Sequence, residues 1–335
     1  AGCAPTAAPE RNGYVQVNVP TEVLAMSGGV GGAKLVLGLA HCLGRDELTI
    51  VCNTADDFEH LGLKICPDLD TVLYTLADWS NKEQGWGQAD ETWSFLDALR
   101  RLGGETWFSL GDRDLATHIF RTGLLREGST LSETVQELSR RMNIAQRVVP
   151  MSDQAISTLV KTRTGENLMF QHYFVRDRCE PPVAGFEFQG VSISEPSPGF
   201  AKALNSCDLA IICPSNPFVS VDPILAVPGV ARTLTARKVP VVVVSNIVAG
   251  QALKGPAAKM MQEMDIPMTA LGVARHYVDK YEGLVTGFVL DHADADLKDS
   301  VESLGLSTIV TKTIMVTLQD KIELGREVLA FAEAS

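Results

Sequence analysis

The chain has 335 residues, and 45% of them are apolar, which suits one large α/β domain with a sizeable core. Its formal net charge of −12 argues against a broad nucleic-acid surface, because such surfaces are basic. No apolar run approaches the roughly eighteen residues of a transmembrane helix, so we expect no membrane span. The seven cysteines form no C-x-x-C pair and lie mostly in apolar runs, which predicts buried thiols in a reducing, cytoplasmic compartment.

The first 20 residues differ in character from the rest of the chain. Residues 1–20 are rich in Ala and Pro and show no hydrophobic period, so we expect a disordered tail there. A single α/β domain is expected over 21–335. It opens with an apolar strand at 23–26, turns through a glycine-rich segment at 27–34 and enters a helical run at 35–40.

The glycine-rich segment suits an anion. Gly28, Gly29, Gly31 and Gly32 let the backbone come close to a ligand and expose its N–H groups. The following helix points its positive end at the same place, and Lys34 adds a mobile charge. The segment lacks the Gly-Lys-Ser/Thr of a Walker loop, and Lys34 stands where a dinucleotide fingerprint needs its last glycine. The alternative is a turn whose glycines serve tight packing alone.

Polar residues gather where the second strand, at 48–52, ends. They are Asn53, Thr54, Asp56 and Asp57 and, after a short loop, Asp68 and Asp70. Carboxylates beside bound phosphates need a cation, and Mg²⁺ uses one or two carboxylates together with phosphate oxygens. The alternative is that Asp57 and Asp68 are ordinary turn and helix-cap residues. In a parallel sheet both strand ends would face one crevice, where open α/β sheets bind ligands.

The later hydrophobic patterns predict helices and strands in alternation. The expected helices cover 70–77, 91–102, 115–125, 130–142, a segment from 257, and 318–334. The expected sheet strands cover 147–150, 209–213, 239–245 and two short segments within 286–311. A hairpin turn at 164–167 and β-like, proline-rich segments predict an insertion at about 143–200, β-rich from 174 to 200. The fold class is therefore α/β, a doubly wound, mostly parallel, Rossmann-like sheet with a β-rich insertion.

Two later motifs carry further candidate residues. In the first, Asp112, Arg113 and His118 stand at the start of a helix, and Arg suits planar, bidentate partners, although a salt-bridged helix start is the alternative. In the second, Ser215 and Asn216 follow a buried strand between two prolines. Asn both donates and accepts, which suits a guanine edge, a ribose or a phosphate, whereas a rigid capped turn is the alternative.

Two tryptophans are candidates for stacking on a flat ring. Trp86 lies in a polar segment between two glycines, and Trp93 lies in the helix predicted over 91–102. Packing against the core or a helix face is the favoured interpretation of both.

Five motifs in order resemble those of one family, the 2-phospho-L-lactate transferases of coenzyme F-420 biosynthesis (CofD in archaea, FbiA in mycobacteria). They are Ser27–Lys34, Asn53–Asp57, Cys66–Tyr74, Leu110–His118 and Pro214–Pro217. The resemblance runs from about Thr21 to near the C-terminus. Some family members carry a basic residue before the Leu-Gly-Asp sequence, where this chain has the uncharged Ser109, so the resemblance implies no charged contact with the acceptor at this position.

The resemblance implies a transferase. It would move a phospho-acid moiety (2-phospholactyl, phosphoenolpyruvyl or 3-phosphoglyceryl) from a guanosine diphosphate-linked donor to the deazaflavin Fo. GMP would leave, and a phosphodiester would form, giving F-420-0 or its dehydro form. Such a displacement depends mainly on positioning and charge neutralisation, so Mg²⁺ is the expected cofactor. The resemblance also suggests a homodimer.

The expected roles follow from the resemblance and the motifs. Mg²⁺ would be held by Asp56 and Asp70, and one of Asp56, Asp57 or Asp70 would orient the attacking hydroxyl. The substrate-binding candidates are Gly28, Gly29, Gly31, Gly32, Lys34, Asn53, Thr54, Asp70, Asp112, Arg113, His118, Ser215 and Asn216. An NAD(P)-type oxidoreductase or nucleotide-binding module that uses the same glycine turn is the alternative function, and a noncatalytic scaffold is a third.

Overall fold

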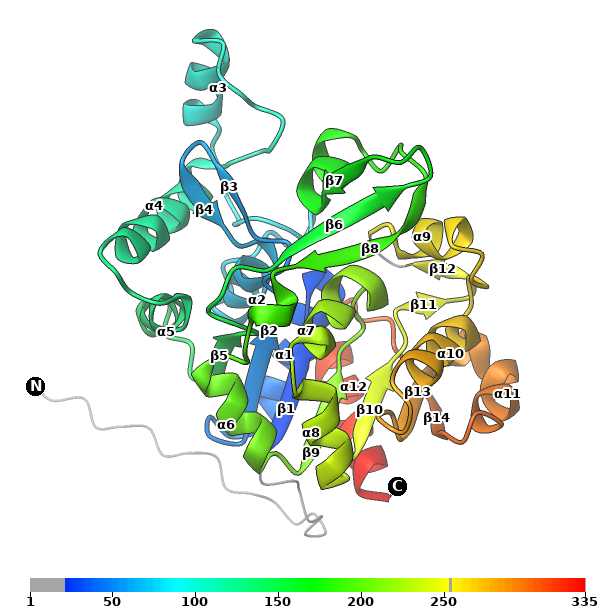
Figure 1. Ribbon diagram of the computed structural model, residues 1–335. Helices are drawn as coiled ribbons and strands as arrows, with labels where there is room; N and C mark the ends of the chain where they lie inside the picture. Colours follow the sequence, from blue (N-terminus) through cyan, green and yellow to red (C-terminus); the bar gives the residue numbers. More distant parts are fainter. Residues whose placement is uncertain (1–21, 253–254, 335) are drawn as a thin grey trace, which may run out of the picture.

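Seven parallel strands form the central sheet of the protein (Figure 1). The structure is a computed structural model that describes residues 22–252 and 255–334, so the tail expected at 1–20 lies outside the described residues. The sheet order is β14-β13-β10-β9-β1-β2-β5, and every neighbouring pair is parallel. The strands are β1 (Val23–Ser27), β2 (Leu48–Cys52), β5 (Arg147–Pro150), β9 (Leu209–Ile212), β10 (Val241–Val244), β13 (Gly287–Asp291) and β14 (Ser307–Thr311).

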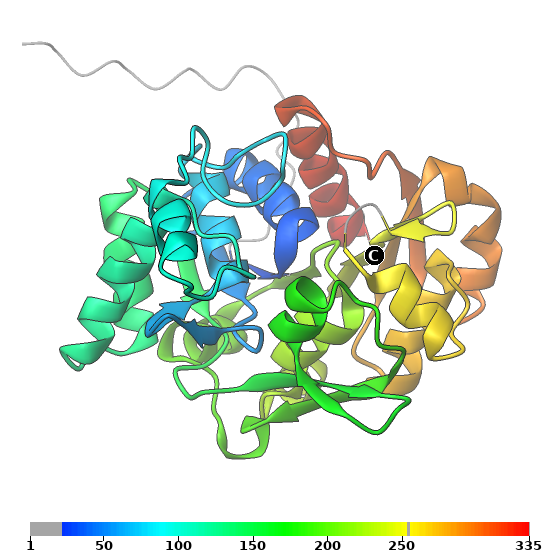
Figure 2. The ribbon, with the colours of Figure 1, turned by 90° about the horizontal axis from the view of Figure 1, so that it is seen from above.

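Helices cover both faces of this sheet, which explains why its inner strands are continuous apolar runs. On β1, Val23 and Ala25 join the core under one helical layer, while Leu24 and Met26 join the core under the other. The first layer holds α1 (Gly29–Cys42), α2 (Pro67–Leu76), α5 (Leu131–Arg141) and α12 (Leu318–Ala334). The second holds α6 (Pro198–Ser206), α8 (Val230–Arg237), α10 (Ala270–Lys280) and α11 (Lys298–Glu302). Seen from above, α1 and α12 lie side by side (Figure 2).

The chain winds outward from the middle of the sheet in two directions. After β1 it adds β2 and β5 on one side, and it then returns to place β9 on the other side of β1. The crevice between the carboxyl ends of β1 and β9 is therefore the topological switch point, where doubly wound sheets bind ligands. The predicted fold class is confirmed by this topology.

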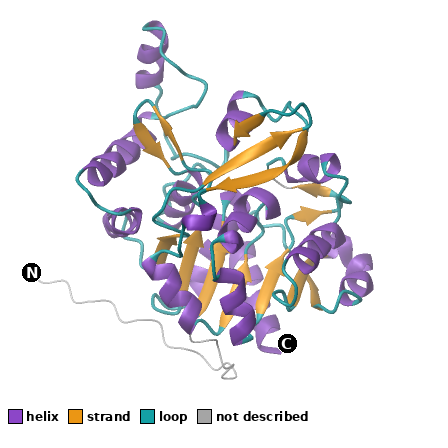
Figure 3. Ribbon diagram, in the orientation of Figure 1, coloured by secondary structure: helices purple, strands orange, loops and turns teal. Residues whose placement is uncertain are grey.

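Smaller elements stand above the carboxyl ends of the strands (Figure 3). A three-stranded antiparallel sheet is the largest of them, and the β3–β4 hairpin and α3 stand beside it (Figure 1). The strands of the three-stranded sheet are β6 (Ser157–Thr162), β7 (Asn167–Met169) and β8 (Val183–Gln189). The others are β3 (Phe58–His60), β4 (Leu63–Ile65), α3 (Ser94–Arg101), α4 (Asp112–Arg126), α7 (Asp222–Ala226), β11 (Ile247–Val248), β12 (Gln251–Ala252) and α9 (Ala257–Glu263).

The structure differs from the sequence prediction at several elements. The β6–β7 hairpin is confirmed, but β5 belongs to the central sheet although it lies within the expected insertion. The prediction of β structure over 174–200 is wrong outside β8, because a π-helical turn (His172–Arg176) precedes it and α6 begins before residue 200. No helix within the described ranges has the length and apolar character that a membrane crossing requires.

Candidate functional site

A cavity of about 810 Å³ opens at the switch point of the sheet. Its wall combines the start of α1, the start of α2, the segment after β9 and the segment 313–316, which are far apart in the sequence. The predicted residues that line it are Gly28, Gly29, Gly31, Lys34, Asp56, Asp70, His118, Ser215 and Asn216. The other predicted residues, described below, lie behind this wall or beside it, so the sheet topology brings together most but not all of the expected site.

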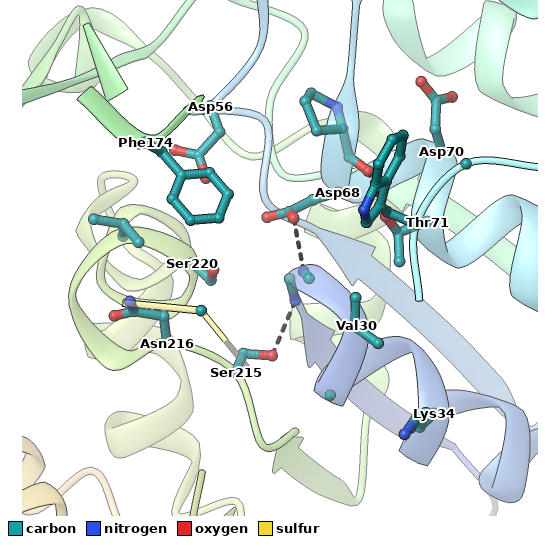
Figure 4. Close-up of a pocket in the computed structure, with 18 of the residues that line it drawn as sticks. Val30, Lys34, Asp56, Asp68, Asp70, Thr71, Phe174, Ser215, Asn216 and Ser220 are labelled. Atoms are coloured by element: carbon teal, nitrogen blue, oxygen red, sulfur yellow. Dashed lines mark hydrogen bonds between the residues drawn. The ribbon is translucent and has the colours of Figure 1, made fainter. Parts of the chain in front are cut away.

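The glycine-rich segment is the first turn of α1 rather than a loop. The helix begins at Gly29, whose φ of +63° is a left-handed conformation that favours glycine. The N–H of Gly29 donates to Oδ1 of Asp68 at 2.7 Å, and the N–H of Gly28 donates to Oγ of Ser215 at 3.1 Å (Figure 4). Two of the backbone donors expected to meet a phosphate are thus bound by side chains of the protein in this conformation.

Close packing accounts for two of the glycines. A Cβ on Gly31 would lie 2.3 Å from the carbonyl oxygen of Pro214, and one on Gly32 would lie 2.4 Å from Oγ of Ser27. The side chain that follows, Lys34, lines the cavity and donates from Nζ to the carbonyl of Met315 at 3.0 Å. The glycines therefore bring α1 against the segment after β9, and this contact forms one edge of the cavity.

Asp56 and Asp68 are buried carboxylates on the cavity wall. Burial raises the pKa of Asp68 to about 6, against the hydrogen bonds that it receives from Asn53 and Gly29. Burial and the nearby charge of Asp68 raise the pKa of Asp56 well above its ordinary value. Among the described residues, Oδ1 of Asp56 has no hydrogen-bond partner. An unpartnered carboxylate oxygen beside a second carboxylate is a donor set that suits a divalent cation.

Asn53 positions this pair without lining the cavity. Its Nδ2 donates to Oδ2 of Asp68 at 2.9 Å and to the carbonyl of Val219 at 3.2 Å, and its side chain is fully buried. Thr54 is also buried and does not line the cavity. The predicted substrate contacts of Asn53 and Thr54 therefore stay predictions. In the structure, Asn53 orients the carboxylate of Asp68 through a hydrogen bond.

Asp57 faces a second, smaller cavity of about 360 Å³, which shares Asp56 with the first. Burial raises the pKa of Asp57, although Lys64, whose Nζ lies 3.5 Å away, lowers it. Neither carboxylate oxygen of Asp57 has a hydrogen-bond partner among the described residues. Its expected catalytic role stays a prediction, because it lies beside the main cavity rather than on its wall.

Asp70 is held by a buried arginine. The guanidinium of Arg121, which is fully buried, pairs with both oxygens of Asp70, and Nη1 lies 3.1 Å from Oδ2. Nη1 also donates to the carbonyl of Lys64 at 3.3 Å. Asp70 lines the cavity, but its charge is already compensated, so its expected roles as magnesium ligand and base stay predictions. Asp68 is the carboxylate whose charge acts most on Asp56.

The Leu110–His118 motif divides between the cavity and the surface. His118 is buried and lines the cavity. Asp112 instead accepts hydrogen bonds from the backbone at the start of α3, and Nη1 of the exposed Arg113 donates to the carbonyl of Ala89 at 2.9 Å. Neither Asp112 nor Arg113 lines the cavity. Their local contacts match the alternative of a helix start tied by charged side chains.

Sequence reasoning missed several residues of the cavity wall, including Tyr74 and Asp114. Oη of Tyr74 donates to Oδ1 of Asp114 at 2.6 Å, and both residues line the cavity. A signal for Asp114 was present, since residues i and i+4 share a helix face and Asp114 stands four before His118. Trp86 also lines the cavity, together with Phe108 and Phe174, so it is placed where a ring could reach it, and its stacking on a ring stays a prediction.

Comparisons with known proteins agree with this architecture. The family model described as 2-phospho-L-lactate transferase CofD matches residues 23–314. A phosphoenolpyruvate transferase of Streptomyces avermitilis is 40% identical over 315 residues, which is 93% of this chain and 98% of the relative. A 2-phospho-L-lactate transferase of Methanosarcina mazei is 36% identical over 307 residues, 92% and 99% of the two chains. A UPF0052 protein of Bacillus halodurans shares the fold, with a TM-score of 0.64 and 16% identity over 92% of this chain and 98% of that one.

Proposed function

The chain belongs to the 2-phospho-L-lactate transferase CofD family of phospho-acid transferases, and from this premise we propose a specific reaction for it. The protein transfers a phospho-acid moiety from a guanosine diphosphate-linked donor to the terminal side-chain hydroxyl of the deazaflavin Fo. The hydroxyl oxygen forms a bond to phosphorus, the bond from phosphorus to the GMP oxygen breaks, and the hydroxyl proton passes to a carboxylate or to water. The product is a phosphodiester.

The observation that carries this proposal is the buried pair of carboxylates beside the N-terminus of α1. Oδ1 of Asp56 is unpartnered among the described residues, and the charge of Asp68 acts on it. A dianionic diphosphate could not approach these carboxylates without a cation between them. We therefore assign Mg²⁺ to Asp56 and Asp68. When bound, it supplies neutralisation of the charge on the diphosphate and on the departing GMP.

The two sides of the cavity suit two different substrates. The start of α1, Ser215 and Asn216 form the side on which we place the guanosine diphosphate part of the donor, because backbone N–H groups and an amide serve phosphates and a base edge. Trp86 and Phe108 line the same cavity and suit a flat ring, so we place the deazaflavin against them. The chain would then act mainly by positioning the two substrates, as displacements at phosphorus require.

The direct test supplies all reactants. Protein, Fo and Mg²⁺ are mixed with each of the three guanylylated acids, and Fo is followed by mass spectrometry alongside GMP release. A mass gain with one acid establishes both the reaction and the donor. No gain with any acid, from folded protein that binds Fo, overturns the proposed donor class.

A matched pair of variants tests the assigned role of Asp56. Asp56→Asn removes the carboxylate whose Oδ1 is unpartnered among the described residues, and we expect turnover at limiting Mg²⁺ to fall by about a hundredfold or more. Asp265→Asn changes an exposed carboxylate outside the cavity lining, and it should behave as wild type. Equal turnover of both variants would remove Asp56 from the mechanism.

The other expectations stay predictions. An NAD(P)-type oxidoreductase has neither the dinucleotide fingerprint nor the family match in its favour, and a titration with NAD(P) tests it. The homodimer and the cytoplasmic location rest on the resemblance and on cysteine usage, and light scattering and fractionation address them.

A further inference from the structure

The carboxylate of Asp114 stands on the cavity wall between α2 and α4. Its Oδ1 accepts a hydrogen bond from Oη of Tyr74 at 2.6 Å, and its Oδ2 lies 3.3 Å from Nε2 of His118. Asp114, Tyr74 and His118 all line the main cavity. The side chain is thus fixed from both sides while it faces the space that a substrate would fill.

The neighbouring arginine sets the orientation of the hydrogen bonds. Nη1 of Arg121 lies 3.2 Å from Nδ1 of His118, and a guanidinium can only donate, so Nδ1 is the acceptor. The other ring nitrogen, Nε2, then carries a hydrogen and lies 3.3 Å from Oδ2 of Asp114. Burial raises the pKa of Asp114, but the nearby His118, the hydrogen bond from Tyr74 and the charge of Arg121 outweigh it, so its pKa is lowered overall.

Asp114 is available to a ligand, whereas the other carboxylates of the cavity wall are assigned to other partners. Asp70 is engaged by Arg121, and Asp56 and Asp68 have raised pKa values and form the assigned cation site. An ionised carboxylate has about four lone-pair positions, so the hydroxyl of Tyr74 and the nearby Nε2 of His118 leave acceptor capacity on each oxygen of Asp114. Such a group suits a neutral hydrogen-bond donor of a ligand, because charged acceptors form the stronger hydrogen bonds.

An aromatic surface belongs to the same end of the cavity. The segment that carries Trp86 is tied to α4, since Nε2 of Gln88 donates to Oγ1 of Thr117 at 3.3 Å. Trp86 and Phe108 both line the cavity. Aromatic side chains and a fixed carboxylate that line one cavity suit a flat ring that carries O–H or N–H groups.

We propose that Asp114 is a substrate-binding residue that accepts a hydrogen bond from an O–H or N–H of the acceptor, whose ring lies against Trp86 and Phe108. Tyr74 and His118 are positioning residues that hold the carboxylate in place. This inference rests on the proposed function, because it assigns Fo to this end of the cavity.

The test compares binding of Fo and of GDP with Mg²⁺ by calorimetry. For Asp114→Asn we expect the affinity for Fo to fall about tenfold or more, the usual effect of losing a hydrogen bond to a charged group, with GDP affinity unchanged. Asp90→Asn, an exposed carboxylate in a neighbouring loop outside the cavity lining, serves as control and should bind both ligands as wild type does. Wild-type affinity for Fo in Asp114→Asn overturns the inference.

Two analogues distinguish the sources of the donor group. One deazaflavin carries a methyl group in place of the polyhydroxyl side chain, and the other carries methyl groups on the ring N–H and on the ring O–H. The analogue that lacks the relevant donor should bind wild type more weakly than Fo and should show no further loss in Asp114→Asn. If Asp114→Asn does not fold, wild-type protein that binds both analogues as tightly as Fo still overturns the inference. Wild-type protein that does not bind Fo overturns the proposed function and this inference together.

Discussion

The backbone N–H of Gly29 donates to the carboxylate of Asp68, and the two atoms lie 2.7 Å apart. An acid from the start of α2 thus occupies the N-terminus of α1, where the sequence predicts a phosphate. Asp68 is also a member of the assigned cation pair with Asp56. A cation bound to Asp68 would weaken the hydrogen bond between Asp68 and Gly29, and the N–H of Gly29 could then bind the donor substrate. Binding of the cation and of the donor substrate should therefore be coupled.

The first prediction concerns pH and Mg²⁺. The pKa of Asp68, at about 6, lies above its ordinary value, so the native state binds more protons than the unfolded state between about pH 4 and 6. The unfolding free energy therefore falls as pH rises through that window, by on the order of 3 kcal/mol from this group. Mg²⁺ binds the ionised pair, so it should raise Tm more at about pH 7.5 than at about pH 5.

Thermal unfolding at both pH values, with and without Mg²⁺, measures this effect. Asp56→Asn should lose most of the Mg²⁺-dependent gain, and Asp265→Asn should keep it. A gain that is equal at the two pH values would contradict the assignment of the cation to Asp56 and Asp68.

The second prediction concerns the contact between α1 and the segment after β9. In Gly31→Ala the new Cβ would lie 2.3 Å from the carbonyl oxygen of Pro214, so the backbone must shift. We expect a loss of about 1–3 kcal/mol in unfolding free energy and weaker GDP binding, because the donor side of the cavity changes shape.

Urea unfolding and a GDP titration check the second prediction against a matched glycine. Gly123 lies in α4, and a Cβ there would meet nothing within 4 Å. Gly123→Ala should therefore raise the unfolding free energy by about 0.5–1 kcal/mol, with GDP affinity unchanged. A Gly31→Ala protein with the stability and GDP affinity of wild type would show that this contact is easily displaced.

The sequence predicted the sheet and the glycine turn because both depend on local patterns. Strands buried on both faces are continuous apolar runs, and a helix entry after a glycine cluster needs few other contacts. These patterns place β1, β2, β9 and β10 correctly and so place the switch point. The β3–β4 hairpin was missed because its three-residue strands are too short to show a period.

The site was predicted less completely because its contacts join distant segments. Nothing in the sequence marks Arg121 as a fully buried partner of Asp70, since an isolated arginine in a polar helix is usually exposed. Asp68 was expected as a possible helix cap, and it does bind a helix N-terminus, but that of α1 rather than its own. Arg113 was chosen by residue type, and its position on α4 directs it out of the cavity.

The third prediction concerns the buried pair of Asp70 and Arg121. Arg121→Met leaves the Asp70 carboxylate buried without its partner, and we expect a loss of about 3–5 kcal/mol in unfolding free energy. The double variant Asp70→Asn with Arg121→Met removes both charges and should recover more than half of this loss. Arg101→Met, on the exposed last turn of α3, should change stability by less than about 0.5 kcal/mol. Urea unfolding of Asp70→Asn, Arg121→Met and the double variant, each against wild type, measures the coupling, and a double effect equal to the sum of the two single effects would contradict a direct ion pair.

The fourth prediction concerns Asp222, which lies outside the cavity and supports it. The buried carboxylate accepts hydrogen bonds from Nζ of Lys280 at 2.6 Å and from Oη of Tyr281 at 3.0 Å. Nε2 of His276 lies 3.0 Å from its Oδ2. These contacts join α10 to the π-helical turn that carries Ser220 into the cavity wall. Asp222→Asn should therefore lower the unfolding free energy by about 1–3 kcal/mol and weaken GDP binding, because the charged contacts that fix the turn to α10 are weakened.

A neighbouring carboxylate on α10 provides the control for this fourth prediction. Asp279 is exposed on the same helix, and Asp279→Asn should match wild type in both stability and GDP affinity. Calorimetric titration with GDP and with Fo, at a temperature where each variant is folded, separates the two effects. We expect the affinity for GDP to fall while that for Fo stays unchanged, because Ser220 follows the Pro-Ser-Asn-Pro segment on the side assigned to the donor. Equal losses for both ligands would indicate that Asp222 supports the whole cavity rather than its donor side.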